Sequence, residues 1–173
     1  METRGRFRIG SSISQRPKGV RTRTSFGHWE LDTVVSSRGK SRACAATFTE
    51  RKTRLYVAVN MPDRTAHSME IALGVVASQY QQGISQTATT DRGKEFACYK
   101  NMEAFHDVKV YFADPYSSWQ RGSNENANGL LREFFPKGHD FADVTDEQLA
   151  DAFRVSYLAL QSVDSNKNKL DYL

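Results

Sequence analysis

The stretch FGHWELDTVVSSRGKSRACAATFTERKTRLYVAVN (residues 26–60) determines the first half of the fold. It contains three runs of β-branched, aromatic and small apolar residues, at 26–35, 42–49 and 53–60. The turn-forming SSRGK and the charged ERK separate these runs. Because both connections are short, we predict three strands in an antiparallel meander.

Beyond residue 60 the pattern alternates between helix and strand. Apolar residues recur every three or four positions from Ala66 to Tyr80, which predicts a helix that has ended by Gly83. A run at 86–90 and the run VKVYFA (108–113) predict two further strands, with a short helix at 94–105 between them. A meander followed by this alternation predicts a mixed α/β sheet.

Two helices are predicted in the last third of the chain. Ser117 followed by Gln120 has the spacing of a capping box and predicts a helix over 118–135, which Pro136 and Gly138 close. Thr145 and Gln148 repeat that spacing ahead of a last helix with an apolar stripe. The stripe comprises Leu149, Ala150, Phe153, Tyr157, Leu158 and Leu160.

Composition fits one globular domain behind a basic leader. The 173 residues are 39% hydrophobic and 25% charged, which is enough apolar material for a buried core. We divide the chain into a basic N-terminal arm at 1–25, extended or mobile, and a core at 26–173. The net charge of +4 is compatible with a polyanionic partner and also with many soluble enzymes.

Several classes of protein are excluded by simple counts. The two cysteines, Cys44 and Cys98, have no Cys or His neighbour at zinc-ligand spacing, so we expect buried thiols in a reducing cytoplasm. No apolar run approaches the roughly 18 residues that a membrane span needs. Four scattered histidines, His28, His67, His106 and His139, give no reason to assign a general base.

Two aspartates lie where a sheet can hold a ligand. Asp32 is inside an otherwise apolar strand, where an ionised carboxylate is costly unless a cation or a metal accompanies it. Asp91 follows the run at 86–90 and precedes a glycine turn, where Asp is also common for purely local reasons. Ligands nevertheless bind at the carboxyl ends of strands in open α/β sheets.

Glu125 lies on the polar side of the predicted 118–135 helix. At 100° per residue, Arg121, Asn128 and Arg132 fall within about 60° of it, opposite the apolar Ala127, Leu130, Leu131 and Phe134. The helix alone leaves two explanations open: a functional face, or the commoner solvent-facing polar stripe.

Taken together, the three acids favour a divalent cation. Unit charges 4 Å apart repel by about 4 kcal/mol at an effective dielectric near 20, so a shared metal is the natural resolution if Asp32, Asp91 and Glu125 converge. Ligation by oxygen alone selects Mg2+ or Mn2+ rather than zinc.

Longer blocks around these acids carry a family resemblance. They are HWELDTV (28–34), TTDRGKEFA (89–97), VKVYFADPYSSWQRGSNENANGLLREFFPKGHDF (108–141) and, weakly, NKLDYL (168–173). The sequence resembles transposases of the insertion-sequence-30 family and, more distantly, retroviral integrase catalytic cores. The interval between Asp91 and Glu125 is similar to the second interval of DDE recombinases.

The resemblance implies a fold, a site and a reaction. The fold would be ribonuclease-H-like, with a five-stranded mixed sheet flanked by helices. Asp32, Asp91 and Glu125 would be the catalytic and metal-binding triad, holding two Mg2+ or Mn2+ ions once DNA is bound. Arg121, Asn128 and Arg132 would contact DNA phosphates. The reaction would be metal-dependent DNA strand cleavage and strand transfer, as in transposition.

The resemblance also implies partners and a location. These are DNA, comprising element ends and target, and further copies of the chain in the active complex, within the bacterial cytoplasm. The N-terminal helix-turn-helix region that recognises element ends in the family would lie outside this sequence.

Two other functions remain open. One is a DNA-binding or dimerisation remnant without catalysis, although such a protein gains nothing from a negatively charged pocket facing phosphates. The other is a ribonuclease-H-like nuclease that acts on another nucleic acid.

Overall fold

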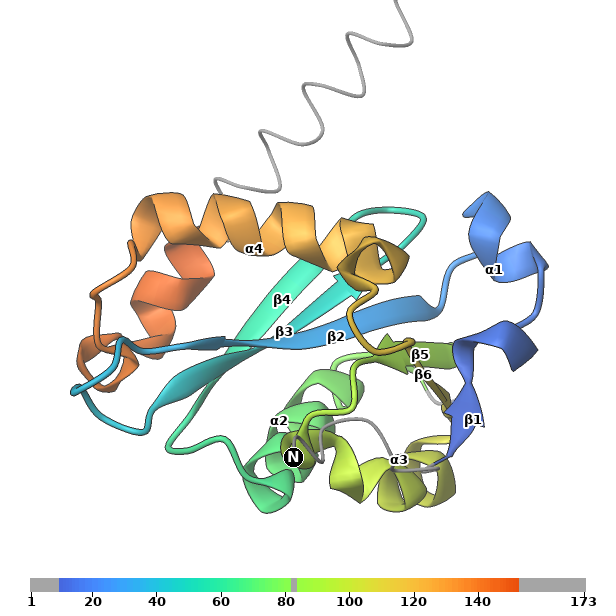
Figure 1. Cartoon of the computed structure of the whole chain (residues 1–173), viewed down its shortest axis with the longest axis horizontal. Coiled ribbons are helices and arrows are strands. Elements are labelled where there is room, and N and C mark those ends of the chain that lie inside the picture. The colour runs from blue at the N-terminus through green and yellow to red at the C-terminus, as the bar shows by residue number, and fades with distance from the viewer. Residues whose placement is uncertain (1–9, 82–83, 153–173) are drawn as a thin grey trace, which may run out of the picture.

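A computed structural model describes residues 10–81 and 84–152 of the chain. It contains a six-stranded sheet in the order β1-β6-β5-β2-β3-β4, with helices on both faces (Figure 1). The predicted mixed α/β sheet is therefore confirmed, with one strand more than the five that were expected. No helix within the described ranges is long and apolar enough to cross a membrane.

The meander forms as the short connections predict. Strand β2 (His28–Val35) pairs antiparallel with β3 (Cys44–Glu50), and β3 pairs antiparallel with β4 (Tyr56–Met61). All seven residues of β3 are buried, because this strand has a neighbour on each side and covering elements on both faces.

The second half of the sheet is parallel and needs crossovers. Helix α2 (Ala66–Ala77) leads to β5 (Thr87–Thr90), and a 3-10 turn, η2 (Lys94–Cys98), with helix α3 (Tyr99–His106) leads to β6 (Lys109–Phe112). Strand β5 pairs parallel with both β2 and β6. Helix α2 ends three residues before the expected Tyr80.

The sixth strand comes from the segment that was expected to be an extended or mobile arm. Strand β1 (Ser11–Ser12) pairs parallel with β6, and the 3-10 turn η1 (Ile13–Gln15) and helix α1 (Gly19–Thr22) follow it. Ile13 and Val20 are buried. Two separated apolar residues show no helical or strand periodicity, so no sequence pattern predicted that this segment packs against the sheet. Residues 1–9 lie outside the described residues.

Two apolar clusters lie on opposite faces of the sheet. The first cluster lies on the side of α2 and α3 and contains Leu31 and Phe48. The second cluster lies on the side of α4 (Gly122–Phe134) and contains Val34 and Leu131 (Figure 1). Strand β2 serves both clusters because alternate side chains point to opposite faces.

The helix predicted at 118–135 begins differently from the prediction. A 3-10 turn, η3 (Ser118–Arg121), precedes α4, and Ser117 makes no side-chain cap. Gln120 instead accepts from the Asp114 amide and donates to the Asp114 carboxylate, so the Ser117–Gln120 capping box was wrong.

After the 3-10 turn η4 (Phe141–Asp143), the second predicted capping box is confirmed. The Thr145 amide donates to Gln148 Oε1, and the Gln148 amide donates to Thr145 Oγ1. Residues 146–152 are helical. The stripe from Phe153 onward and the block NKLDYL lie outside the described residues.

Candidate active site

Asp32 and Asp91 lie at neighbouring positions in the sheet. Strands β2 and β5 are parallel, and their register pairs Glu30 with Thr89. Two residues further along each strand the chain reaches Asp32 on β2 and Asp91 just past the end of β5. The parallel pairing thus brings together two carboxylates that are far apart in sequence.

One guanidinium contacts both aspartates. Arg121 Nη1 lies 3.3 Å from Asp32 Oδ2, and Arg121 Nη2 lies 3.5 Å from Asp91 Oδ2. Arg121 Nη1 also donates to the Leu31 carbonyl at 3.3 Å. The Arg121 side chain is only 13% exposed, so this positive charge is held between two carboxylates in a partly desolvated place.

Asp32 is further oriented by neutral donors. Its Oδ1 accepts from the Thr33 amide at 2.8 Å, and its Oδ2 accepts from Asn128 Nδ2 at 3.1 Å. Tyr56 in turn donates its hydroxyl to Asn128 Oδ1 at 2.8 Å. Burial raises the pKa of Asp32 above its ordinary value, while the Arg121 charge and the Thr33 amide oppose this rise.

Glu125 is not gathered with the two aspartates. It lies exposed in the first turn of α4, and the described part of the chain holds no trio of acidic, His or Cys side chains placed to hold a metal. Arg121, four residues before it, and Asn128, three after it, both contact Asp32. Glu125 therefore lies between two residues of the site, and its place in the triad stays a prediction.

Two of the three predicted DNA contacts lie in the site, and the third binds farther along β2. Arg121 and Asn128 bind Asp32 as described, and Arg132 Nη2 donates to the Val35 carbonyl at 2.8 Å. The Arg132 guanidinium also lies over the Phe141 ring, 5.8 Å from its centroid. These side chains tie α4 to β2 here, and their contact with DNA stays a prediction.

Sequence reasoning missed Glu95, a buried acid directly behind Asp91. Its Oε1 is 2.6 Å from Arg64 Nη2 and accepts from Thr33 Oγ1 at 2.9 Å, while its buried Oε2 has no hydrogen-bond partner among the described residues. A Cβ on Gly93 would clash with Glu95 Oε2. The sequence DRGKE (91–95) was the available signal. Gly93 has no Cβ, which leaves room for the Glu95 carboxylate next to the turn.

Glu30 was also missed, although it lies on the same strand face as Asp32. It is fully buried, forms an ion pair with Arg51, and accepts from the Asn124 amide at 2.8 Å. Asn124 Oδ1 in turn accepts from Thr47 and Thr49. Glu30 therefore fixes the first turn of α4 over the sheet.

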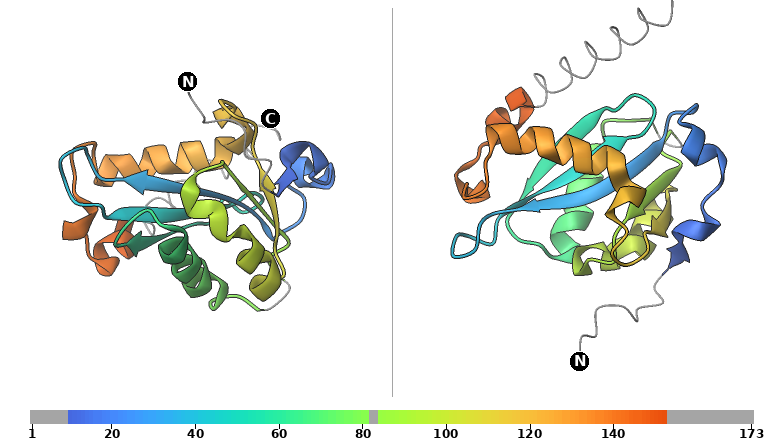
Figure 2. Two further views of the ribbon diagram at one scale, coloured as in Figure 1. Left: turned by 60° about the horizontal axis from the view of Figure 1, so that its bottom comes forward. Right: turned by 45° about the horizontal axis from the view of Figure 1, so that its top comes forward.

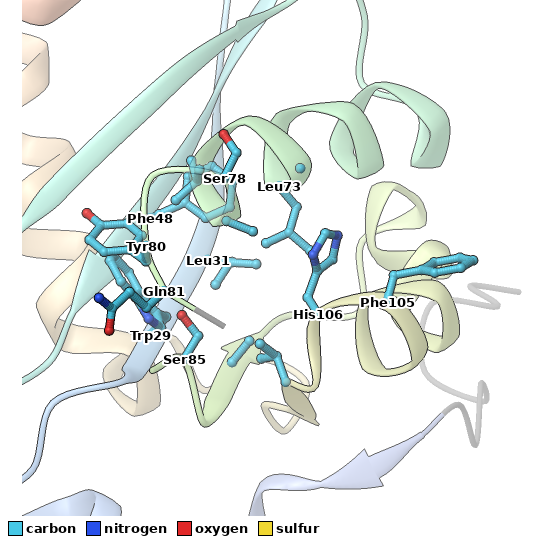
Figure 3. Close-up of a pocket in the computed structure, with 15 residues that line it drawn as sticks. Trp29, Leu31, Phe48, Leu73, Ser78, Tyr80, Gln81, Ser85, Phe105 and His106 are labelled. Carbon is cyan, nitrogen blue, oxygen red and sulfur yellow. The ribbon is translucent and has the colours of Figure 1, made fainter. Parts of the chain in front are cut away.

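A separate apolar hollow has no part in this chemistry. It measures about 270 Å³ and lies between the sheet and helices α2 and α3, on the face opposite α4 (Figure 3). Leu31 and Phe48 point into it, together with Trp29 and Tyr80. The described residues that line it include no carboxylate, so it lacks the anionic oxygen ligands that Mg2+ or Mn2+ prefers.

The sheet order, with α4 on one face and α2 and α3 on the other, defines an α/β core of the retroviral-integrase type. Two solved structures share it. One is from a simian T-cell lymphotropic virus intasome, with TM-score 0.61, 17% identity and coverage of 75% of this chain and 47% of the other. The second is the HTLV-2 integrase catalytic core in complex with magnesium, with TM-score 0.56, 16% identity and coverage of 75% and 83%.

The Integrase core domain family matches residues 23–118, and the chain belongs to this family. That span contains Asp32 and Asp91 and ends before Glu125. The chain is 38% identical to the transposase of element IS1086 from Cupriavidus metallidurans, over 86% of this chain and 43% of that protein. It is 37% identical to the transposase InsI of IS30A from Escherichia coli, over 81% and 36%. The chain thus spans about two fifths of the length of these relatives.

Proposed function

We propose that this chain is the catalytic core of a DDE-type transposase, which cuts DNA strands and joins them to a target in the bacterial cytoplasm. The observation that supports this most directly is the convergence of Asp32 and Asp91 on the Arg121 guanidinium. Two acids at the ends of parallel neighbouring strands, in a chain of the integrase core family, are where such an enzyme needs its metal ligands.

The residues at this place fit Mg2+ or Mn2+. Asp32 and Asp91 offer hard carboxylate oxygens, and the pair already accommodates a shared positive charge. Glu125 is proposed as the third ligand because it lies on α4 between Arg121 and Asn128. When bound, a pair of such ions supplies activation of a water or a DNA 3′-hydroxyl and stabilisation of the leaving oxygen.

The chain's own side chains orient the ligands and the DNA. The Thr33 amide and Asn128 fix the Asp32 carboxylate in one orientation. Arg121 occupies the space between the two aspartates, and its guanidinium would become available to a phosphate if a metal ion took that place. Together with Asn128 and Arg132, it is proposed to align the DNA backbone along the first turns of α4.

The proposed partners are DNA and further copies of this chain. One structural neighbour is described as part of an intasome and another as a trimeric form, which supports an oligomeric active complex here. We expect DNA binding by these 173 residues to rest mainly on contacts with backbone phosphates, so it should be weak, largely independent of sequence and steeply salt-dependent.

Calorimetric titration with Mn2+ tests the metal site. Asp32→Asn and Asp91→Asn should each weaken binding, because each removes an anionic ligand. Asp107→Asn is a matched control: it removes the same charge from an exposed residue whose φ of 52° suits Asn. Mn2+ affinity that is unchanged in both site variants would contradict the assignment of these aspartates.

A cleavage assay tests Glu125. With Mn2+ and a pre-nicked element-end duplex, Glu125→Gln should nearly abolish strand cutting and leave DNA binding intact, because it removes the charge and keeps the size. Glu133→Gln is the control on the same helix, since Glu133 is exposed and points away from Asn128. If the core alone is inert, the variants are placed in a full-length relative. Cutting by Glu125→Gln at the wild-type rate would remove Glu125 from the triad.

A further inference from the structure

The N-terminal segment forms one wall of a second cavity, outside the aspartate site. This cavity measures about 390 Å³ and is lined by three parts of the chain. They are the η1–α1 segment, Arg51, and the connection from Asp114 to Gly122 that leads into α4. The η1–α1 segment lies at the β6 edge of the sheet in both views of Figure 2.

Four arginines dominate the lining. They are Arg16, Arg21, Arg23 and Arg51, and we call this hollow the arginine cavity. Among the described residues, its only lining carboxylate is Asp114, whose Oδ2 is already held by Gln120. An excess of guanidinium groups around a hollow this size is suited to a bound anion.

The partners of these arginines within the chain leave most of the positive charge uncompensated. Arg51 is buried and forms an ion pair with Glu30, while Arg16 is half-buried and donates to Thr89 Oγ1, a neutral acceptor. Arg21 and Arg23 are exposed and form no ion pair within residues 10–81 and 84–152.

Repulsion between these arginines also disfavours their protonated forms. Burial, and next the positive charge of Arg51, lower the pKa of Arg16 to about 10. Partial desolvation of its guanidinium, and next the positive charge of Arg51, also lower the pKa of Arg23, although much of its side chain is exposed. Both groups remain protonated at neutral pH. A bound anion would relieve this repulsion, which gives the cavity an intrinsic preference for negative ligands.

A smaller hollow of about 190 Å³ adjoins the arginine cavity and shares Arg23 and Gly122 with it. Gly122 begins α4, so the positive end of that helix dipole lies where the two hollows meet. Ser123 also lines the smaller hollow, and its buried hydroxyl has no hydrogen-bond partner within the described residues. Arginines, a helix N-terminus and a hydroxyl together form a phosphate-binding environment.

One aromatic side chain next to the arginines could contact a part of the ligand other than its phosphate. Trp119 lines the arginine cavity and is 72% exposed, an unusual cost for an indole ring unless something covers it. Unpaired bases stack on exposed aromatic side chains, and this is how single strands are held without sequence preference. Paired bases in a duplex do not offer their faces in this way.

We propose that the arginine cavity binds a backbone phosphate of single-stranded DNA, with the neighbouring unpaired base stacked on Trp119. The inference deepens the proposed function and rests on it for the choice of DNA as the ligand. Arg121, which contacts both Asp32 and Asp91, directly precedes Gly122 of the cavity lining, so the cavity adjoins a residue of the candidate active site. The cavity would therefore hold a frayed strand beside the site that cuts it.

The test measures binding of a fluorescent 12-nucleotide single strand to the whole chain in EDTA, so that no metal contributes. The double variant R21A/R23A should bind at least about tenfold more weakly. The slope of log affinity against log salt should fall by about 1.4, or about 0.7 for each lost phosphate contact on a single strand. The matched control is R38A/K40A, which removes two exposed positive charges from the β2–β3 connection and should change affinity less than about twofold.

Trp119 supplies an independent signal. The chain has two tryptophans, and Trp29 is buried, so quenching of the exposed indole by the oligonucleotide reports on Trp119. Trp119→Leu should abolish the quenching and weaken single-strand binding with little effect on a blunt duplex. Thermal unfolding monitored by circular dichroism verifies that each variant is folded, as expected for exposed positions.

Three outcomes overturn the inference. One is an equal loss of affinity in R21A/R23A and R38A/K40A, which would mean that only net charge matters. The second is the absence of quenching. The third is binding of inorganic phosphate that depends on Arg21 and Arg23 while oligonucleotide binding does not, which would make the cavity a site for free phosphate. A chain that passes these tests but fails to bind Mn2+ would retain the cavity and lose the proposed catalysis.

Discussion

The two faces of the sheet differ in what they bury. On the face covered by α2 and α3, the first cluster is built from apolar side chains such as Leu31, Phe48 and Met69. On the face covered by α4, buried Glu30, Thr47 and Asn124 adjoin the second cluster. Adjacent residues of β2 and β3 contribute to opposite faces. The apolar face therefore stabilises the fold. This stability can offset the cost of burying charged groups on the α4 face.

In the described part of the chain, buried polar atoms without a hydrogen-bond partner occur on both faces, for example at Trp29 and Glu95 on the α2 side, and on the α4 side they lie at the start of the helix. Arg121 Nε and Asn124 Nδ2 are buried without a hydrogen-bond partner among the described residues. A buried unsatisfied polar group costs about 1–3 kcal/mol. On the α4 side these atoms belong to Arg121, which contacts both aspartates, and to Asn124, which the buried Glu30 holds in place.

The largest effect is expected on the apolar face. Phe48→Ala should lower the free energy of unfolding by about 3–5 kcal/mol, since it opens a cavity beneath a fully buried ring. Urea denaturation measures this. Thr47→Val, one residue away on the other face, is the comparison and should cost only about 1 kcal/mol, the value of one hydrogen bond to Asn124. Equal costs would erase the contrast between the faces.

On the α4 face the largest effect is expected from Glu30→Gln, at about 3 kcal/mol. The substitution leaves the buried Arg51 charge without its counter-ion, which is worse than removing both charges. The double variant Glu30→Met with Arg51→Met should recover part of the stability in the same denaturation experiment. Failure of the double variant to recover any of it would assign the loss to the Asn124 contact of Glu30 instead.

A change in metal affinity is expected from Arg121→Ala. Because the guanidinium occupies the space between Asp32 and Asp91, its removal should raise Mn2+ affinity about tenfold, equivalent to about 1.4 kcal/mol. Calorimetric titration measures the change. Arg132→Ala, which loses a bond to the Val35 carbonyl and not to an aspartate, should leave Mn2+ affinity unchanged. Weaker binding in Arg121→Ala would show that Arg121 positions the ligands rather than competing for them.

The smallest effect concerns acid stability at the rim of the α4 face. Hydrogen bonds from Ser41 hold the pKa of Asp140 at about 2, below its ordinary 3.8. The folded-state pKa is depressed, so this contribution is complete above about pH 4 and is lost as pH falls toward 2. Ser41→Ala should therefore reduce the drop in melting temperature between pH 5 and pH 2. An unchanged drop would show that other carboxylates control acid unfolding.

Local sequence patterns predicted most of the helices and strands. Contacts between residues far apart in the sequence were not predicted and are known only from the structure. Alternation located β2 and β3, and the Thr145–Gln148 spacing located a helix start. Strand β1 was missed because two serines carry no periodic signal and pair with residues a hundred positions away. Ser117 failed as a cap because Gln120 bonds to Asp114 instead, a competition that spacing alone does not reveal.

The candidate site was predicted in part for the same reason. Strand character and a strand end pointed to Asp32 and Asp91, and parallel pairing brings them together. The role of Arg121 between them was not foreseen, since helical angle places a residue on a face but does not say which groups it reaches. Glu30 and Glu95 were passed over because their partners, Arg51 and Arg64, come from other segments.

The pairing of Ser11 with Tyr111 also sets an order of events during synthesis. At about 5–20 residues per second, a ribosome needs about 5–20 s to make the chain between these two residues. Throughout that interval strand β1 has no β6 with which to pair. The wall that the η1–α1 segment contributes to the arginine cavity is therefore among the last parts of the molecule to be assembled, after the meander has had time to form.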